Sequence, residues 1–279
     1  MRFTKMQGAG NDYVYVDCIS QLIPEEERPA LARYVANRNF GVGSDGLICI
    51  CASDKADFHM DMYNADGSRS EMCGNGVRCV GKYVHDRGLT DKEIVTVETG
   101  AGIRTLWLHV KNGRTESVRV CMGRAEFAPE RIPVAASGES FIDQSVEVEG
   151  EFFRVTALSM GNPHAVVFVE DTEEVDIERL GPAFENHPLF PERVNTEFVQ
   201  IIDRNTLKMR VWERGSGETL ACGTGATAAL AAAVVCGHTE ESASLQLRGG
   251  ELFIEWNREE DLLYMTGPAE FVFDGELFL

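Results

Sequence analysis

The sequence predicts an α+β protein with two pseudo-symmetric lobes, each a mostly antiparallel sheet that holds one buried helix. Three observations support this fold class: an internal repeat half a chain apart, many short strand-like runs, and a helix-favouring stretch after each copy of the repeat. A chain of 279 residues is long enough for two domains, each with its own core. We place the lobes at residues 1–122 plus 268–279 and at residues 123–267.

The repeat consists of two cysteine-containing segments. Residues 62–76 read MYNADGSRSEMCGNG, and residues 211–225 read VWERGSGETLACGTG. At an offset of 149 residues, the two segments bring Cys-Gly-x-Gly into register. A Gly-Asn pair also recurs, at Gly10-Asn11 and Gly161-Asn162, with an offset of 151. Two offsets near half the chain length indicate two related lobes of similar size.

A helix is expected directly after each cysteine. Residues 76–88 carry valines at helical spacing, and residues 226–237 are rich in alanine and apolar on every side, so the second helix should be buried. Gly88 and Gly237 are suitable C-terminal stops. Two further helices, each polar on one face, are predicted at residues 25–37 and 176–187.

Alternating or β-branched runs predict strands over most of the remaining chain. Turn residues separate these runs at short intervals, which favours antiparallel meanders over a βαβ alternation. A stretch with prolines and a glycine near the midpoint, residues 127–140, is the closest thing to a linker. The predicted strands are residues 13–18, 46–52, 58–63, 94–99, 103–110, 117–122, 152–157, 165–169, 197–203, 206–212, 244–247, 252–256 and 262–266.

Composition and charge exclude several kinds of partner. The formal net charge of -19 and the sequence pI near 4.7 argue against nucleic acid, because phosphate binding needs clustered Lys and Arg. The sequence contains no signal-peptide core and no apolar run of the ~18 residues that a membrane span needs, so we expect a cytoplasmic protein with no membrane partner. Its eight cysteines should then be thiols. The sequence allows a homodimer.

The two Cys-Gly-x-Gly elements carry the chemistry. Unpaired N–H groups at a helix start favour thiolate over thiol and can hold a carboxylate. One such cysteine alone would more often be a buried spacer, but two copies in register change that interpretation. If the lobes pack face to face, Cys73 and Cys222 stand on opposite sides of a small ligand. A thiolate and a thiol so placed can invert a carbon that bears a hydrogen, with no metal and no organic cofactor.

Six ordered motifs run along almost the whole chain. They are KMQGAGNDY at residues 5–13, GVGSDG at 41–46, NADGSRSEMCGNGVR at 64–78, GNPH at 161–164, FPERVNTEF at 190–198 and WERGSGETLACGTG at 212–225. With these motifs the sequence resembles the diaminopimelate epimerase family. The resemblance implies a curled sheet or barrel around a central helix in each lobe, and LL to meso interconversion of diaminopimelate in lysine and peptidoglycan precursor biosynthesis.

The resemblance also implies roles for individual residues. Cys73 and Cys222 are the acid and base. Arg214 grips the distal carboxylate in a bidentate fork, and Glu213 accepts from an ammonium group. His164 influences the ionisation of the cysteines, and the alternative is that it only orders the loop after Pro163. The remaining substrate-binding residues are the asparagines Asn11, Asn64, Asn162 and Asn195 and the helix-start amides of Gly74, Asn75, Gly223 and Thr224. Gly46 stands where some members carry a substrate-contacting glutamine, so Gly46 is left out of the binding set.

Two alternatives stay open. A proline or hydroxyproline racemase of the same two-cysteine architecture would act on a substrate without a distal carboxylate and amine, and Glu213-Arg214 weighs against it. A dithiol redox or zinc protein would use the same cysteines differently. Zinc is disfavoured because Cys73 and Cys79 lack a zinc-type spacing. The C-x-C at Cys49 and Cys51 is expected to point its thiols to opposite faces of a strand, so no metal site is expected there.

Overall fold

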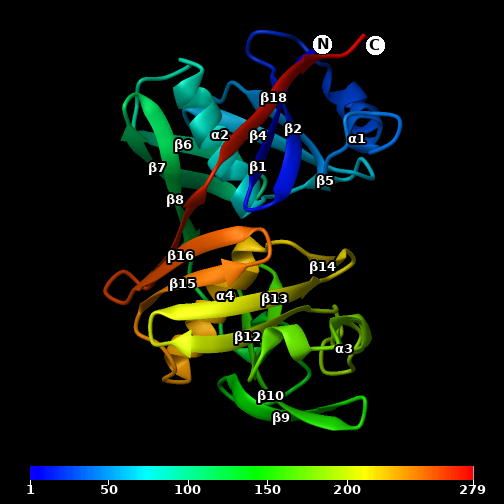
Figure 1. Cartoon of the computed structure of the whole chain (residues 1–279), viewed down its shortest axis with the longest axis vertical. Helices are drawn as coiled ribbons and strands as arrows, with labels where there is room; N and C mark the ends of the chain where they lie inside the picture. Colours follow the sequence, from blue (N-terminus) through cyan, green and yellow to red (C-terminus); the bar gives the residue numbers. More distant parts are fainter. Residues whose placement is uncertain (279) are drawn as a thin grey trace. The chain divides into compact units, whose positions relative to one another are not determined.

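The computed structural model describes residues 1–278 and separates into two compact units (Figure 1). Unit 1 comprises Met1–Val120 and the C-terminal stretch from Thr266, and unit 2 comprises Cys121–Met265. The chain passes out of unit 1 in strand β8 (Arg114–Gly123) and returns to it in β17 (Leu262–Pro268). Each unit has its own apolar core.

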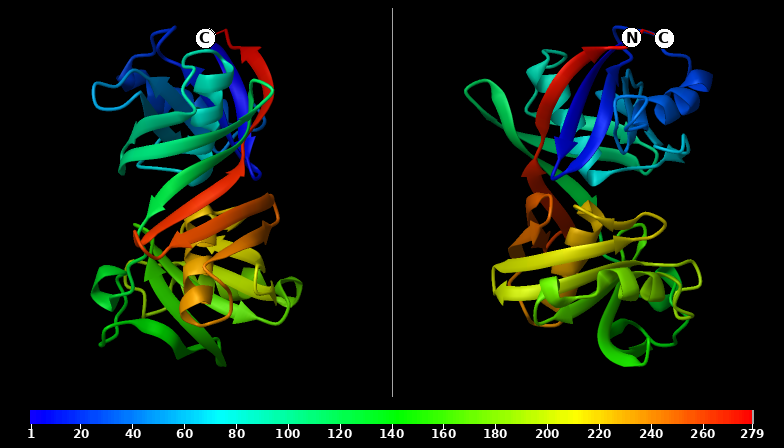
Figure 2. Two further views of the ribbon diagram at one scale, coloured as in Figure 1. Left: turned by 90° about the vertical axis from the view of Figure 1, so that its left-hand side faces the viewer. Right: turned by 45° about the vertical axis from the view of Figure 1, so that its right-hand side comes forward.

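Unit 1 is a curved sheet whose strands are paired in the order β18, β1, β2, β3, β4, β6, β7, β8. The short β5 (Arg69–Ser70) pairs with the far end of β4. Figure 2 shows β18, the last strand, lying alongside the N-terminal β1. The other strands are β1 (Arg2–Gly8), β2 (Asn11–Asp17), β3 (Gly46–Cys51), β4 (Phe58–Asn64), β6 (Ile94–Thr99), β7 (Gly102–Lys111) and β18 (Glu270–Glu276).

Unit 2 repeats the order of the first seven of these strands as β9, β10, β11, β12, β13, β15, β16, with the short β14 paired to the far end of β13. These strands are β9 (Phe141–Val148), β10 (Glu151–Ser159), β11 (Pro163–Val169), β12 (Asn195–Asp203), β13 (Thr206–Glu213), β14 (Gly217–Thr219), β15 (Ser242–Leu247) and β16 (Gly250–Asn257). From β3 to the second helix of unit 1, each position matches unit 2 at an offset of 149 residues. The internal repeat is therefore a repeat of topology.

Two helices in each unit connect parallel neighbours in the sheet. In unit 1, α1 (Arg28–Ala36) lies between the parallel β2 and β3, and α2 (Gly74–Asp86) between the parallel β4 and β6. In unit 2, α3 (Ile177–Glu185) and α4 (Gly223–Val235) take the same places. Short 3-10 turns occur at Glu25–Glu27, Pro129–Arg131 and Thr172–Glu174. No helix in residues 1–278 is long and apolar enough to cross a membrane.

The two cysteine-linked helices are the most buried ones, which the sequence predicts for the alanine-rich second helix. In α4, ten of thirteen residues are buried, and the helix contacts β10, β11, β12, β15 and β16, so the sheet curves around it. In α2, eleven of thirteen residues are buried, and it contacts β1, β2 and β7. An alanine-rich helix suits this position because small side chains let the surrounding strands approach closely.

Several predictions about the fold were wrong. We expected antiparallel meanders without βαβ units, but four pairs of neighbouring strands are parallel. The sequence pattern did not show them because their helical crossovers are short and most neighbouring strands are antiparallel. Strands β1, β9 and β18 were missed: β1 is buried on both faces and β18 is exposed on both, so neither alternates. The predicted linker at residues 127–140 is part of unit 2, since Ile132 and Val134 are buried in its core. The helix predicted from residue 25 begins as a 3-10 turn and becomes α-helical only at Arg28, next to Pro29.

Candidate active site

Cys73 is the N-cap of α2. Its backbone is extended, with φ -129° and ψ 121°, and its sulfur accepts a hydrogen bond from the amide of Gly76 at 3.3 Å. The sulfur therefore lies at the positive end of the helix, beside N–H groups that have no partner within the helix. The same first turn includes the predicted binding residues Gly74 and Asn75, and both are buried.

Asn11 contacts Cys73 from the start of β2. The Cys73 thiol donates to Asn11 Oδ1 at 3.1 Å, and Asn11 Nδ2 donates to Asp45 Oδ2 at 2.7 Å. Because a carboxylate can only accept, Asp45 determines which end of the Asn11 amide faces the sulfur. Burial raises the pKa of Asp45, although its bonds to the Asp12 amide and Asn11 oppose that shift. Sequence reasoning missed Asp45, which follows Ser44 within the GVGSDG motif.

Asn64 serves the local turn in this structure. Its Nδ2 donates to Ser68 Oγ at 3.0 Å, and its backbone amide donates to the Ser68 carbonyl. This is the ordinary use of an asparagine in a turn. The predicted contact of Asn64 with a substrate stays a prediction.

Cys222 is the N-cap of α4, with nearly the same backbone as Cys73. Its φ is -123° and its ψ 115°, and its sulfur accepts from the Gly225 amide at 3.3 Å. Thr224 Oγ1 lies 3.4 Å from the sulfur. Both predicted cysteines thus occupy the same position of equivalent helices, which begin at Gly74 and Gly223.

A line of polar side chains leads away from Cys222. Thr224 Oγ1 accepts from Asn162 Nδ2 at 3.4 Å, and Asn162 Oδ1 lies 3.0 Å from His164 Nε2. On its other side, His164 Nδ1 lies 2.7 Å from Glu197 Oε1. His164 and Glu197 have no exposed surface. His164 therefore belongs to the polar network of this half-site, and the loop-ordering role alone does not describe it.

Two carboxylates act on the ionisation of Cys222. Burial raises the pKa of the Cys222 thiol well above its ordinary value, and the negative charges of Glu213 and Glu197 raise it further. Burial also raises the pKa of Glu213, while hydrogen bonds from Thr219 and Cys222 oppose that shift. Thr219 Oγ1 donates to Glu213 Oε1 at 2.5 Å. Burial and these two charges therefore favour the thiol of Cys222 over the thiolate.

Asn195 and Arg214 form a second linked pair in unit 2. Asn195 Nδ2 donates to the Pro163 carbonyl at 2.9 Å, and its Oδ1 accepts from the Arg214 amide at 2.9 Å. The Arg214 guanidinium donates to the Glu192 carbonyl at 2.9 Å. Asn195 thereby positions both the strand that carries His164 and the turn that carries Arg214. A direct contact between Asn195 and a substrate stays a prediction.

The repeat reveals that the two half-sites differ in charge. At the offset of 149, Glu213 corresponds to Asn64 and Glu197 corresponds to Ile48. The pairing of β2 with β3 and of β11 with β12 places Tyr13 where His164 lies. Unit 2 therefore surrounds its cysteine with two carboxylates and a histidine, and unit 1 has uncharged residues at those positions. Sequence reasoning missed Glu197, although the repeat offset would have set it opposite an isoleucine.

Gly46 has a structural role that excludes a side chain. A Cβ on Gly46 would lie 2.0 Å from the Tyr63 carbonyl oxygen. No other residue fits without moving β4, so this backbone excludes a side chain at position 46.

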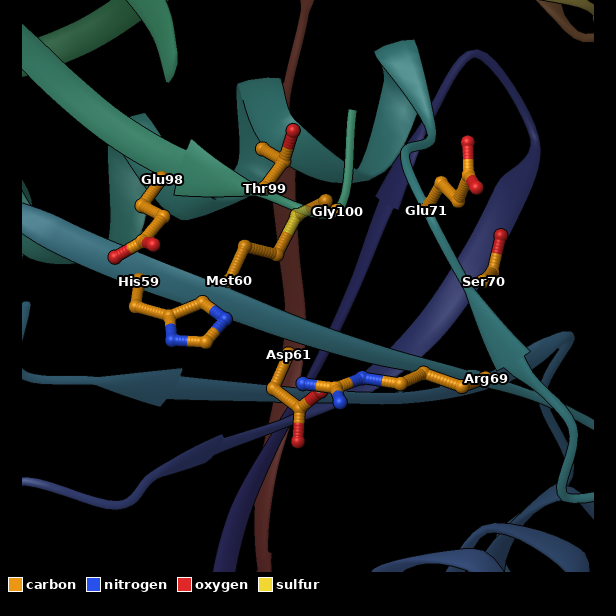
Figure 3. Close-up of a pocket in the computed structure, with 9 residues that line it drawn as sticks. All are labelled: His59, Met60, Asp61, Arg69, Ser70, Glu71, Glu98, Thr99 and Gly100. Atoms are coloured by element: carbon orange, nitrogen blue, oxygen red, sulfur yellow. The ribbon is translucent and has the colours of Figure 1, made fainter. Parts of the chain in front are cut away.

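A cavity in unit 1 is lined by residues of β4, β5 and β6 and does not include Cys73 in its lining (Figure 3). It has a volume of about 330 Å³ and opens where β4 leaves β5 to pair with β6. In Figure 3 the Arg69 side chain reaches toward Asp61, and the two form an ion pair at 2.7 Å. A second cavity of about 200 Å³ occupies the same place in unit 2. Because both units have it, this cavity is a feature of the fold.

The expectation for Cys49 and Cys51 was wrong. The two residues are two positions apart in β3, so they share a face of the strand. Both thiols are hydrogen-bonded to Cys18, and the bond to Cys49 contributes most to a pKa of about 12 for Cys18. Within residues 1–278, no group of three or more His, Cys, Asp or Glu side chains is arranged to hold a metal ion.

Solved structures share this fold at low sequence identity. A PhzF-family phenazine biosynthesis protein from Bacillus anthracis has a TM-score of 0.73 and 18% identity, covering 100% of this chain and 99% of that one. A hydroxyproline epimerase from Agrobacterium vitis, with bound trans-4-hydroxy-L-proline, has a TM-score of 0.70 and 15% identity, covering 99% and 90%. The class is thus the fold of PhzF-family proteins and hydroxyproline epimerase, here with a cysteine cap on one helix of each unit.

Sequence comparison identifies the family within this class. The profile described as Diaminopimelate epimerase matches residues 3–128 and 156–272. Diaminopimelate epimerase of Acetivibrio thermocellus is 54% identical over 279 residues, which cover 100% of this chain and 99% of the relative. The chain belongs to the diaminopimelate epimerase family.

Proposed function

We infer that this protein is an isomerase that interconverts LL- and meso-diaminopimelate by proton transfer between two cysteines and the α-carbon. The observation that carries the inference is the pair of cysteine N-caps, Cys73 and Cys222, at equivalent positions of two equivalent units in a chain of this family. Family membership favours this reaction over that of a proline-type racemase. Family membership also favours the epimerase reaction over a dithiol redox or zinc-binding function.

The chemistry divides into two proton transfers. One cysteine, as thiolate, removes the α-hydrogen from one face of the carbon, and the other, as thiol, supplies a proton to the opposite face. The negative charge that develops spreads into the adjacent carboxylate, and the amides at the starts of α2 and α4 suit that charge. Neither transfer calls for a metal or an organic cofactor. The reverse reaction starts from the opposite protonation states.

The polar groups near the two N-cap cysteines, Cys73 and Cys222, recognise the diamino diacid. Asn11 and Asn162 hold amides that can donate to a carboxylate and accept from an ammonium. The Arg214 guanidinium donates to the Glu192 carbonyl through Nη1. Its planar, forked geometry suits a bidentate hydrogen bond to the distal carboxylate. Glu213 is hydrogen-bonded to Thr219 and Cys222. We therefore propose that Glu213 raises the pKa of the Cys222 thiol, in addition to accepting from an ammonium group of the substrate.

The test is solvent deuterium exchange. The protein is incubated with LL-diaminopimelate in D₂O and reductant, and deuterium at the α-carbons is followed by NMR. We expect deuterium at one α-carbon and formation of the meso isomer. Cys73→Ala and Cys222→Ala should each lower turnover by at least about a thousandfold, because one proton transfer loses its group. Full exchange in both variants would refute the two-thiol mechanism, and turnover of L-proline or trans-4-hydroxy-L-proline instead would favour the racemase.

Two further proposals concern the setting of the enzyme. A mechanism that needs a thiol and a thiolate suits the reducing cytoplasm, and none of the eight cysteines, all within residues 1–278, is in a disulfide. A homodimer is also proposed, and light scattering on the purified protein would measure its mass.

A further inference from the structure

Glu197 is a buried carboxylate that no role so far accounts for. It lies in β12 below the first turn of α4 and has no exposed surface. One carboxylate oxygen lies 2.7 Å from His164 Nδ1, and the other has no hydrogen-bond partner in the described structure. Burying a carboxylate with so few partners is unfavourable, so its presence calls for a reason.

The fold itself does not require this carboxylate. Unit 1 builds the same helix start over the same strand position with Ile48. A Cβ on Gly76 would lie 2.8 Å from Ile48 Cδ1, and a Cβ on Gly225 would lie 2.6 Å from Glu197 Oε1. Both glycines admit a side chain from the strand below. Since an isoleucine serves the packing in one unit, the glutamate in the other serves something besides packing.

Glu197 determines how the His164 ring is held. A carboxylate can only accept, so His164 Nδ1 donates to Glu197. The Asn162 oxygen can also only accept, so Nε2 donates to Asn162 Oδ1. Asn162 in turn donates to Thr224 Oγ1, which lies 3.4 Å from the Cys222 sulfur. The order of groups from Glu197 to the sulfur is therefore continuous within unit 2. In unit 1, Tyr13 and Ile48 take the places of His164 and Glu197, so the histidine and the carboxylate of this line are particular to unit 2.

We propose that Glu197 is a positioning residue for the epimerase reaction, and that it acts only through His164. This inference rests on the proposed function. Glu197 fixes the ring orientation and the hydrogen on Nδ1, as an outer partner fixes a histidine in other catalytic and metal sites. The ring then holds the Asn162 amide, whose Nδ2 is directed to Thr224 beside Cys222. The competing interpretation is an ion pair that only stabilises unit 2.

A double-mutant cycle separates the two interpretations. The variants are Glu197→Gln, His164→Asn and the combination, assayed with LL-diaminopimelate. We expect Glu197→Gln to lower kcat by about 10- to 100-fold, with KM changed less than about twofold. The combination should be no slower than His164→Asn alone, because Glu197 has no effect once the ring is gone. If the fold-decrease in kcat of the double variant equalled the product of the two single decreases, Glu197 would act independently of His164 and the proposal would be overturned.

A matched control and a spectroscopic measurement complete the test. Glu218→Gln removes another ion-paired carboxylate of unit 2, bound to Arg210 at 2.8 Å and outside this line, and should keep kcat within about twofold of the wild type. Nitrogen-15 NMR of His164 should show hydrogen on both ring nitrogens in the wild type and on only one of them in Glu197→Gln, because no carboxylate then faces Nδ1. An equal loss of kcat in Glu218→Gln, or an unchanged His164 spectrum, would overturn the proposal.

Two outcomes are kept distinct by the design. If the wild-type protein does not exchange deuterium into diaminopimelate, the proposed function fails. If the wild type is active and Glu197→Gln matches it, only the role of Glu197 fails. Should Glu197→Gln not fold, Glu197→Ile copies the residue that unit 1 uses at this position, and the same kcat and non-additivity criteria apply to it.

Discussion

At the scale of single residues, two cysteines with the same backbone geometry have different surroundings. Both sulfurs accept an amide hydrogen bond at 3.3 Å from the glycine three residues on. Glu213 and Glu197 lie around Cys222, and Asn64 and Ile48 occupy those positions around Cys73. The helix start alone would treat the two thiols alike, so the difference between them comes from neighbouring strands.

The pH dependence of Cys222 alkylation tests this difference. Burial raises the pKa of Cys222, and the charge of Glu213 raises it further, so the thiol persists to higher pH than an ordinary cysteine. Glu213→Gln removes the second cause, and the pKa of Cys222 should fall. Iodoacetamide labelling of Cys222 in a Cys73→Ala background should then begin at lower pH than with Glu213 present. The same labelling profile with and without Glu213 would show that its charge is not felt at the sulfur.

At the scale of elements, α2 and α4 have the same length and the same cysteine N-cap. In each helix, the side chain four residues after the first glycine donates a hydrogen bond to the carbonyl of that glycine. In α4, Thr227 Oγ1 donates to the Gly223 carbonyl at 2.8 Å. In α2, Arg78 occupies that position, donating to the Gly74 carbonyl at 3.3 Å and, from Nε, to the Pro268 carbonyl at 3.2 Å. Arg78 has no exposed surface. The arginine therefore ties the start of α2 to the C-terminal stretch of unit 1.

Replacing Arg78 tests how much this tie stabilises unit 1. Arg78→Thr copies the residue of α4 and retains a donor for Gly74, but it leaves the Pro268 carbonyl without this donor and opens a void. We expect the free energy of unfolding to fall by about 2–4 kcal/mol. Thr227→Val, which removes a single hydrogen bond, should cost about 1 kcal/mol. Urea denaturation measures both, and similar values for the two variants would contradict the assigned role of Arg78.

At the scale of the whole molecule, both ends of the chain build unit 1. Strand β1 lies between β2 and β18, the Met1 amino group donates to the Leu277 carbonyl at 2.7 Å, and Thr4 donates to Asp274 at 2.7 Å. In unit 2, β9 takes the position that β18 has in unit 1. Each unit thus receives its outer strand from the segment that follows the crossing strand, β8 or β17.

Deleting residues 269–279 should therefore damage unit 1 more than a terminal truncation usually would. The deletion exposes the edge of β1, and an unpaired edge strand favours aggregation. We expect a lower melting temperature, loss of solubility, and faster hydrogen exchange at β1 amides, while amides of α4 keep their protection. Hydrogen exchange read by mass spectrometry gives both values in one experiment. Unchanged exchange in β1 would mean that β18 does not hold that strand.

The sequence predicted much of the fold and the paired cysteines because both leave local signals. The offset of 149 identifies the repeat, and α4 shows its burial through a run of alanines with no polar face. Strands β1 and β18 escaped because their two faces have the same burial, which removes the alternation that marks a strand. The parallel pairs escaped because pairing direction depends on contacts between distant segments.

The sequence by itself determined that two equivalent helices begin at cysteines, since Cys-Gly-x-Gly and its apolar continuation are contiguous along the chain. Only the tertiary structure decided what surrounds each sulfur. Asp45 is hydrogen-bonded to Asn11, which lies 34 residues away in the chain, and Glu197 contacts His164, which lies 33 residues away. Local pattern cannot report such contacts, because hydrogen bonds and buried charges depend on distance in space, and the curved sheet sets that distance.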